Sequence, residues 1–328
     1  MMAFKNLVGQ PELRKALLTE LEAGSVSPVT LLTGPGGSGK KSWGIALARA
    51  LLCPVSSCRP CGVCLSCRQL NGGNNPNLFL IHPEGRWIKI DQIRRVRPRL
   101  YLASPEDECR VLLISGADRM TPEAGSSLLK LLEEPPERLY IILTSSHPEK
   151  LLSTIISRCR RYVLQLLSVD EITLLLNSEE ILSGVEVGLI ARLSHGLPGR
   201  ARELAPDPAL GERIKLAMEL ARDLVTPAVS APDLFRRASS LAEREDLLFI
   251  LELLYIYYRD LLLRLLCGPS DLHILPRPSS YPRVSPASLE LSLEDISRAI
   301  KRIAFTNAHK QLALEAMIIL LQRRFAGA

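Results

Sequence analysis

Residues 31–42 read Leu-Leu-Thr-Gly-Pro-Gly-Gly-Ser-Gly-Lys-Lys-Ser, a pattern typical of a buried strand, a glycine-rich turn and the start of a helix. Glycines allow consecutive backbone N–H groups to point inward and form an anion-binding nest, and a following lysine reaches the outer phosphates of a nucleotide. The stretch therefore predicts a nucleotide-binding loop. Its candidate binding residues are Gly34, Gly36, Gly39, Lys40, Lys41 and Ser42.

The residue that follows the loop lysine normally supplies a hydroxyl group to Mg²⁺. Here that residue is Lys41, and Ser42 lies about 100° farther around the predicted helix. A shift of register to Lys41 and Ser42 does not restore the motif, because Pro35 and Lys40 would then take the two glycine positions. The magnesium ligand of the loop is therefore missing.

A second metal-binding element is missing after the apolar strand expected at residues 110–114. Hydrolysing proteins of this class place an acidic pair there, with one carboxylate for Mg²⁺ and the other for the attacking water. Ser115 and Gly116 occupy these positions, and Asp118 fits a helix cap or a surface charge better than a catalytic role. We expect a nucleotide-binding scaffold that has lost the capacity to hydrolyse ATP. Because the backbone nest and Lys40 are still present, weak ATP binding is the most that we expect.

Five of the eight cysteines lie within residues 53–67. Such density in a reducing compartment favours a metal site over disulfides, and thiolates at this spacing converge on tetrahedral zinc. The expected ligands are Cys61, Cys64 and Cys67, with Cys53 favoured over Cys58 as the fourth. A loop of reduced cysteines and an iron–sulfur cluster are the alternatives. Four protein ligands leave no open position, so the zinc would be structural.

Composition bounds the remaining possibilities. The chain has 328 residues, 47% of them hydrophobic, which is enough for two or three domains, and a net charge of +6 that neither requires nor excludes nucleic acid nearby. The first residues contain no apolar leader, so we expect a cytoplasmic protein. The most apolar segment, residues 247–267, contains four charged residues and is interpreted as a buried helix rather than a membrane span.

The order of expected elements gives the fold class. Strands and helices alternate through residues 1–166, which predicts an α/β domain with a mostly parallel sheet covered on both faces. Residues 167–206 are expected to form a small helical lid that begins with a capping box at Ser168 and Glu171, and residues 207–328 a helical domain. An arginine-rich helix at residues 94–99 is expected to end early at Pro98.

Five motifs together resemble one family, the AAA+ subunits of the bacterial DNA polymerase III clamp loader. They are Val8-Gly9-Gln10, the cysteine cluster after the loop helix, residues 126–136, Ser157-Arg158-Cys159 and the lid segment Gly196–Ala201 with Arg200 as a nucleotide-site residue. The resemblance implies an AAA+ domain with an inserted zinc module, a lid and an α-helical collar. Without the magnesium ligands, the chain resembles the delta-prime subunits more than the hydrolysing tau/gamma subunits.

The resemblance also implies partners and a role for one arginine. The expected partners are tau/gamma and delta subunits, the sliding clamp and, through the complex, primed DNA, with no membrane. Arg158 would act in trans on the γ-phosphate held by a neighbouring tau/gamma subunit, as arginine fingers do. The alternative is that Arg158, close to Arg160 and Arg161, forms only surface ion pairs.

Two other functions remain open at this point. One is an active tau/gamma-like ATPase, in which Ser42 or Asp118 replaces the missing ligands. The other is a stand-alone DNA-binding protein that uses the basic residues 94–99, although a solvated helix face is the favoured interpretation of that run.

Overall fold

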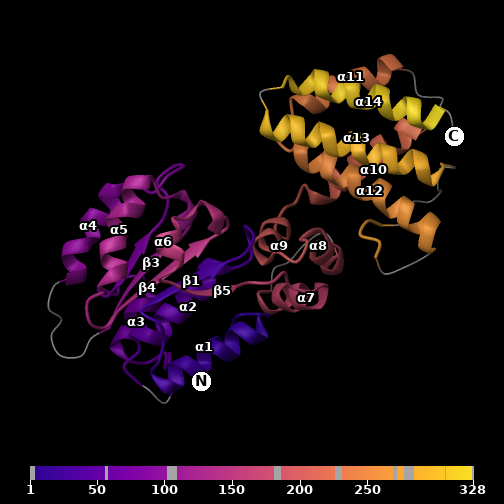
Figure 1. Cartoon of the computed structure of the whole chain (residues 1–328). Coiled ribbons are helices and arrows are strands. Elements are labelled where there is room, and N and C mark those ends of the chain that lie inside the picture. The colour runs from indigo at the N-terminus through magenta and orange to yellow at the C-terminus, as the bar shows by residue number, and fades with distance from the viewer. Residues whose placement is uncertain are drawn as a thin grey trace. The chain divides into compact units, whose positions relative to one another are not determined.

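The computed structural model of the chain divides into two compact units (Figure 1), Met1–Ile181 with Ser194–Glu203 and Leu182–Leu193 with Leu204–Ala328. The residues that it describes are 4–55, 58–101, 109–180, 186–225, 231–268, 272–276, 284–306 and 308–326. Unit 1 contains every motif singled out in the sequence, and unit 2 is helical.

Unit 1 is built on a five-stranded sheet in the order β2-β3-β4-β1-β5, and all of the pairings are parallel. Its strands are β1 (Val29–Thr33), β2 (Leu78–Ile81), β3 (Arg110–Ile114), β4 (Leu139–Ser145) and β5 (Arg160–Val163). The central strand β1 is buried along its whole length, with Leu31 opposite Leu143 on one side and opposite Arg161 on the other. Continuous apolar runs of this kind are typical of parallel sheets covered on both faces.

Helices cover both faces of the sheet (Figure 1). The helical elements of unit 1 are α1 (Pro11–Ala23), α2 (Lys40–Leu52), α3 (Leu65–Asn71), α4 (Ile90–Tyr101), η2 (Ala117–Arg119), α5 (Pro122–Glu133), η3 (Pro148–Lys150), α6 (Ser153–Ile156), α7 (Val169–Ser178) and α9 (Pro198–Leu204). α4, α5 and α6 pack on one face, and α1, α2 and α3 pack on the other. The expected α/β class with a parallel sheet is confirmed.

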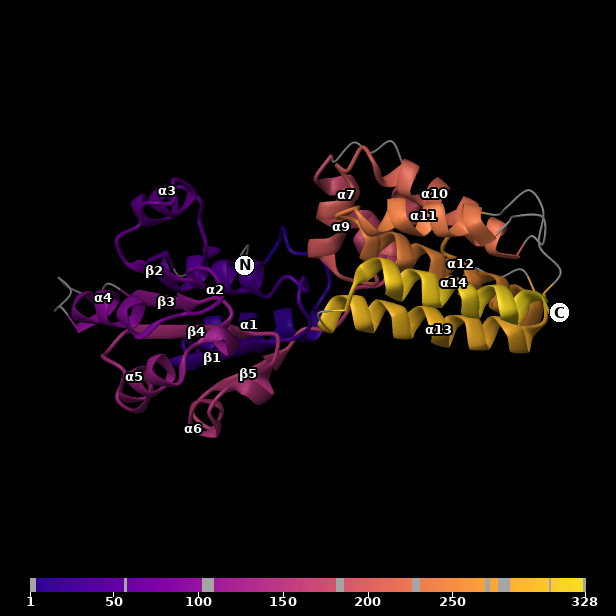
Figure 2. The ribbon, with the colours of Figure 1, turned by 90° about the horizontal axis from the view of Figure 1, so that it is seen from above.

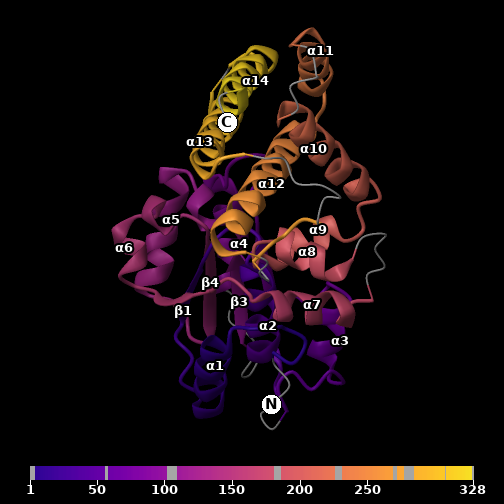
Figure 3. The same ribbon diagram turned by 90° about the vertical axis from the view of Figure 1, so that its right-hand side faces the viewer.

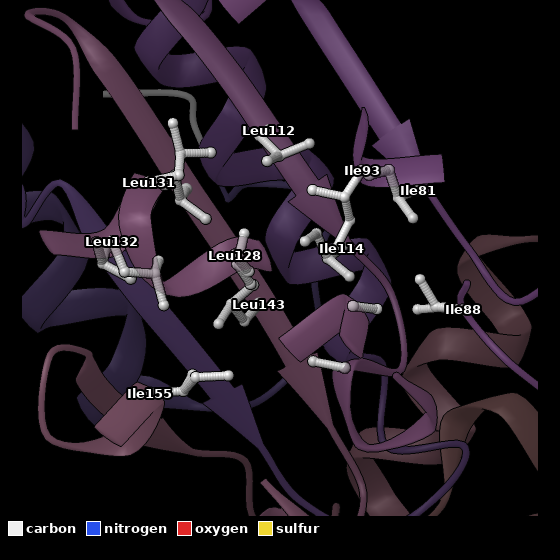
Figure 4. Close-up of a cluster of buried hydrophobic side chains, with 14 of the residues drawn as sticks. Ile81, Ile88, Ile93, Leu112, Ile114, Leu128, Leu131, Leu132, Leu143 and Ile155 are labelled. Atoms are coloured by element: carbon white, nitrogen blue, oxygen red, sulfur yellow. The ribbon is translucent and has the colours of Figure 1, made fainter. Parts of the chain in front are cut away.

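Alternate residues of each strand enter one of two cores. Leu112 and Leu143 face the core beneath α4 and α5, which Figure 4 shows, whereas Leu113 and Ile142 face the core around Trp43 of α2. This alternation follows from the two-residue period of a strand. It also fixes the direction in which the loops leave the strand ends.

Unit 2 consists of six helices among the described residues: α8 (Val187–Leu193), α10 (Leu210–Val225), α11 (Ala231–Ala242), α12 (Leu247–Cys267), α13 (Pro286–Phe305) and α14 (Lys310–Ala326). α13 and α14 run side by side (Figure 2), and α12 contacts both α10 and α13 (Figure 3). The Tyr258 hydroxyl in the middle of α12 is buried and donates to the Ala221 carbonyl at 2.9 Å. In the part of the chain that the structure describes, no helix has both the length and the apolar character needed to cross a bilayer.

Candidate functional site

The glycine-rich loop connects β1 to α2, and three of its glycines have positive φ angles. The values are 149° at Gly34, 78° at Gly37 and 90° at Gly39, which caps the start of α2. Residues with a Cβ rarely adopt these angles, so the loop can take this path only with glycines. The sequence analysis named Gly34, Gly36 and Gly39 but did not name Gly37, although the spacing within the loop gave no reason to leave it out.

The Lys40 ammonium group points back into its own loop. Its Nζ donates to the Gly34 carbonyl at 2.7 Å and to the Pro35 carbonyl at 2.6 Å, and Ser38 Oγ lies 3.4 Å away. The residue is only 8% exposed. Burial lowers the pKa of Lys40, and the nearby Asp118 carboxylate opposes that shift. In this conformation Lys40 therefore ties the loop together from within.

The start of α9 closes over the loop. The backbone N–H of Gly199 donates to the Gly37 carbonyl at 2.8 Å, and a Cβ on Gly199 would lie 3.0 Å from the Gly37 Cα. The adjacent cavity, lined by Ser42 and Trp43 among others, measures about 20 Å³, which is room for about one water molecule. Arg200, the nucleotide-site residue implied by the resemblance, lies in α9 with its backbone nitrogen against Gly37.

The positions after β3 that would carry the acidic pair line a cavity of about 790 Å³ together with Gly36 of the loop. Lys41 is exposed, and Ser115 and Gly116 follow β3 as the sequence predicted. The Gly116 N–H donates to Thr144 Oγ1 at 3.0 Å. Asp118 Oδ1 accepts from the Ser146 N–H at 3.0 Å, which ties η2 to the end of β4. Asp118 thus makes a structural contact through Oδ1, and it also lines the cavity beside Gly36.

Four thiols come together beside α3. The sulfur atoms of Cys53, Cys61, Cys64 and Cys67 all lie within 4.8 Å of one another, and the Cys61 and Cys67 sulfurs are 4.0 Å apart. Tetrahedral zinc with Zn–S bonds of about 2.3 Å needs sulfurs about 3.8 Å apart. Cys58 is outside this cluster as the described residues show it. A cluster of this size could bind a metal ion and is compatible with structural zinc.

The backbone around the thiols favours thiolates. N–H groups point at three sulfurs, from Cys61 to Cys53 at 3.4 Å, from Cys64 to Cys61 at 3.3 Å and from Cys67 to Cys64 at 3.4 Å. These N–H groups, those of Cys64 and Val63 first, lower the pKa of the Cys61 thiol to about 6, whereas burial raises the pKa of Cys67. A cation is what would allow all four to ionise together, because metal binding displaces thiol protons.

Arg158 lies on a short fixed segment between α6 and β5. Ser157 Oγ donates to the Thr154 carbonyl at 3.2 Å, and the Cys159 thiol donates to the Ile155 carbonyl at 3.0 Å while packing against the core. Burial raises the pKa of Cys159 to about 11, so it stays a neutral thiol. The residues on either side of Arg158 are thus anchored, and its own side chain is 36% exposed.

Two further arginines follow on β5, and both have partners in unit 1. Arg160 pairs with the buried Glu20 at 2.7 Å, and Arg161 Nε donates to Thr33 Oγ1 at 3.2 Å. Arg158 makes different contacts, to the Thr154 carbonyl and the Glu133 carboxylate. The structure therefore separates Arg158 from the two arginines that join β5 to its neighbours.

Comparison with known proteins now gives the family. A sequence model of the family described as "DNA polymerase III, delta subunit" matches residues 9–168. The chain is 36% identical over 151 residues to DNA polymerase III subunit delta' of Bacillus subtilis, which covers 46% of each chain. Over residues 9–168, just under half of the chain, the sequence resembles the delta-prime clamp-loader subunits. Escherichia coli subunit tau is 34% identical over 170 residues, or 52% of this chain and 26% of that protein.

The alignments have limited extent. The chain spans about half the length, or less, of the curated relatives that it matches. A DNA polymerase III gamma subunit-related protein of Thermotoga maritima aligns in structure over 94% of this chain and 99% of that chain, with 19% identity and a TM-score of 0.44. The delta-prime resemblance therefore rests on unit 1.

Proposed function

We propose that the chain is a non-hydrolysing, delta-prime-like subunit of the DNA polymerase III clamp loader. In that role it would assemble in the cytoplasm with tau/gamma and delta subunits, help to place the sliding clamp on primed DNA and supply Arg158 to a neighbouring ATPase subunit. Residues 167–206 would be its lid and residues 207–328 its collar. The observation that carries the proposal is the contrast between the closed glycine loop and the exposed, anchored Arg158.

The loop supports the loss of hydrolysis. Mg²⁺ would find no hydroxyl at Lys41 and no carboxylate at Ser115 or Gly116. Lys40 is engaged with loop carbonyls, and the Gly199 N–H bonds to the Gly37 carbonyl. The tau/gamma-like ATPase is the weaker alternative because Asp118 is already held by the Ser146 N–H.

The position of Arg158 supports action in trans. Phosphoryl transfer concentrates negative charge on the γ-phosphate oxygens, and a guanidinium supplied from another subunit can raise the rate about 10³-fold or more. Such a group has to be held by a rigid segment, and the bonds of Ser157 and Cys159 to α6 provide one. Arg158 bonds to Thr154 and Glu133 and would reach the partner with its remaining N–H groups.

The cysteine cluster would hold one structural zinc ion. Cys53, Cys61, Cys64 and Cys67 would be its ligands, and the bound ion would stabilise the segment between α2 and α3. The zinc would supply folding energy to this module and no chemistry, because four thiolates leave no open coordination position.

The test is the ATPase rate of the loader reconstituted from this chain with its tau/gamma and delta subunits, clamp and primed DNA. We expect Arg158→Ala to lower the stimulated rate without abolishing it, because other sites take their arginines from other chains, and to leave assembly intact. Arg161→Ala is the matched control, since that arginine bonds to Thr33. The isolated chain should hydrolyse no ATP.

Two results would contradict the proposal. An Arg158→Ala loader with unchanged ATPase and loading rates would make Arg158 an ordinary surface charge. Turnover by the isolated chain that Lys40→Ala abolishes would favour the tau/gamma-like alternative. Salt-dependent DNA binding by the chain alone, with no co-purifying partner, would favour the stand-alone DNA-binding alternative.

A further inference from the structure

The guanidinium of Arg158 is held in its own subunit by one carboxylate. Its Nη2 donates to Glu133 Oε1 at 3.0 Å, and its Nη1 donates to the Thr154 carbonyl at 3.0 Å. We infer that Glu133 is a positioning residue that pre-orients Arg158 for the γ-phosphate of the neighbouring subunit. This inference rests on the proposed function, because it gives Glu133 a role only through Arg158.

The backbone fixes Glu133 at the end of α5. Leu131 and Leu132 are buried in the core under that helix, and Pro135 and Pro136 follow the C-cap residue Glu134, so the helix cannot continue. Figure 4 shows Leu132 of α5 and Ile155 of α6 in the same hydrophobic cluster. Glu133 thus belongs to α5 and Arg158 to the segment that follows α6, two elements anchored on one core although 25 residues separate the pair in sequence.

The two bonds leave most of the guanidinium free to donate. Arginine has five N–H donors, and Glu133 and Thr154 take one each, so Nε–H and one N–H on each terminal nitrogen remain for phosphate oxygens. A side chain held in one conformation loses less entropy when it binds than one that must be ordered first. The pair thus orients the Arg158 guanidinium and leaves three of its five N–H groups available to donate to phosphate oxygens.

The exposed fractions of Arg158 and Glu133 set how much rate should be lost when the Glu133 carboxylate is removed. Arg158 is 36% and Glu133 48% exposed, so solvent screens the pair and it is a weak one. We expect loss of the carboxylate to slow the site that Arg158 serves by about two- to fivefold. That is far less than loss of the arginine itself, because the Thr154 carbonyl still holds one nitrogen.

The experiment is a double-mutant cycle in the reconstituted, clamp- and DNA-stimulated loader. Glu133→Ala should lower the part of kcat that Arg158→Ala removes by about two- to fivefold with the KM for ATP unchanged, and Glu133→Gln should keep at least about half of that part because its amide oxygen still accepts from Nη2. Glu134→Ala, at the neighbouring exposed carboxylate, is the matched control. In the Arg158→Ala background, Glu133→Ala should cause no further loss.

The outcomes separate the inference from the proposed function. If Arg158→Ala lowers the rate while Glu133→Ala leaves it unchanged or raises it, the inference is wrong and the arginine proposal stands. If Glu133→Ala causes the same loss in both backgrounds, Glu133 acts through general structure and the inference is also wrong. If Arg158→Ala changes nothing, the proposed function itself fails. A melting curve of each variant, with assembly checked by co-purification, excludes simple misfolding as the cause.

Discussion

Replacement of Lys40 by methionine tests whether this lysine has become a structural residue. Methionine keeps an unbranched apolar stem but removes the ammonium group and its bonds to the Gly34 and Pro35 carbonyls. Each hydrogen bond from a charged donor contributes about 1.5–3 kcal/mol. Burial lowers the pKa of Lys40, so desolvation of the ammonium opposes this gain. We therefore expect a net loss of about 1–2 kcal/mol.

The assay is thermal unfolding of the full chain, with Lys41→Met as the matched control because Lys41 is exposed. A loss of 1–2 kcal/mol in a unit of this size lowers its Tm by about 2–8 °C. The control should melt like the wild type. Hydrogen exchange at the buried Ser38, whose N–H donates to the Pro35 carbonyl at 3.2 Å, should also speed up in Lys40→Met, because the loop loses the bonds from Lys40.

Two results would refute this reasoning. An unchanged or raised Tm in Lys40→Met would show that the free energy needed to desolvate the ammonium is at least as large as the free energy gained from its hydrogen bonds. A Tm that ATP raises in the wild type but not in Lys40→Met would show that the lysine still binds phosphate, since a ligand that binds only the folded state stabilises it.

The remaining predictions concern the thiol cluster and unit 2. Cys64→Ser should lower the zinc content below one ion per chain by metal analysis and lower the Tm, whereas Cys58→Ser, outside the cluster, should change neither; the opposite pattern would overturn the ligand set. Hydrogen bonds from Arg244 first, and also from Arg213, lower the pKa of Asp246 to about 2. A carboxyl group whose pKa is lowered by folding stabilises the folded state at pH values above its unfolded pKa, and this stabilisation is lost as the pH falls through its folded pKa. Asp246→Asn should therefore lower the free energy of unfolding by about 1–2 kcal/mol at pH 7 and flatten its pH dependence between about pH 4 and 2. Equal curves for both proteins in urea titrations would contradict this.

The features that the sequence predicted well are those fixed by local chemistry. The capping box at Ser168 is present, with the Glu171 N–H donating to Ser168 Oγ at 3.2 Å and the Ser168 N–H to Glu171 Oε2 at 2.8 Å. The buried strands β1, β3 and β4 were recognisable because both of their faces are apolar. The grouping of four cysteines followed from their spacing, since thiolates two residues apart converge on one ion.

Features that depend on tertiary contacts were missed. β5 was not predicted because its residues Arg160–Val163 are mostly exposed, and only pairing with β1 makes them a strand. The expected early end of the arginine-rich helix at Pro98 was wrong, because α4 continues to Tyr101. Pro98 is exposed, so water can replace the one helical hydrogen bond that its ring removes.

The contact between Gly199 and Gly37 joins segments about 160 residues apart, and neither glycine is unusual in its local sequence. A chain that gives up hydrolysis still has to satisfy the groups that a nucleotide would have bound, because a buried ammonium or backbone group without a partner is costly. Here the Lys40 ammonium turns to carbonyls of its own loop, and Gly199 bonds to the loop from outside. Neither change touches Arg158, whose contacts are with α5 and α6. The contacts of the loop and the contacts of Arg158 are therefore made by different elements of unit 1, so a substitution that disrupts one set should leave the other in place.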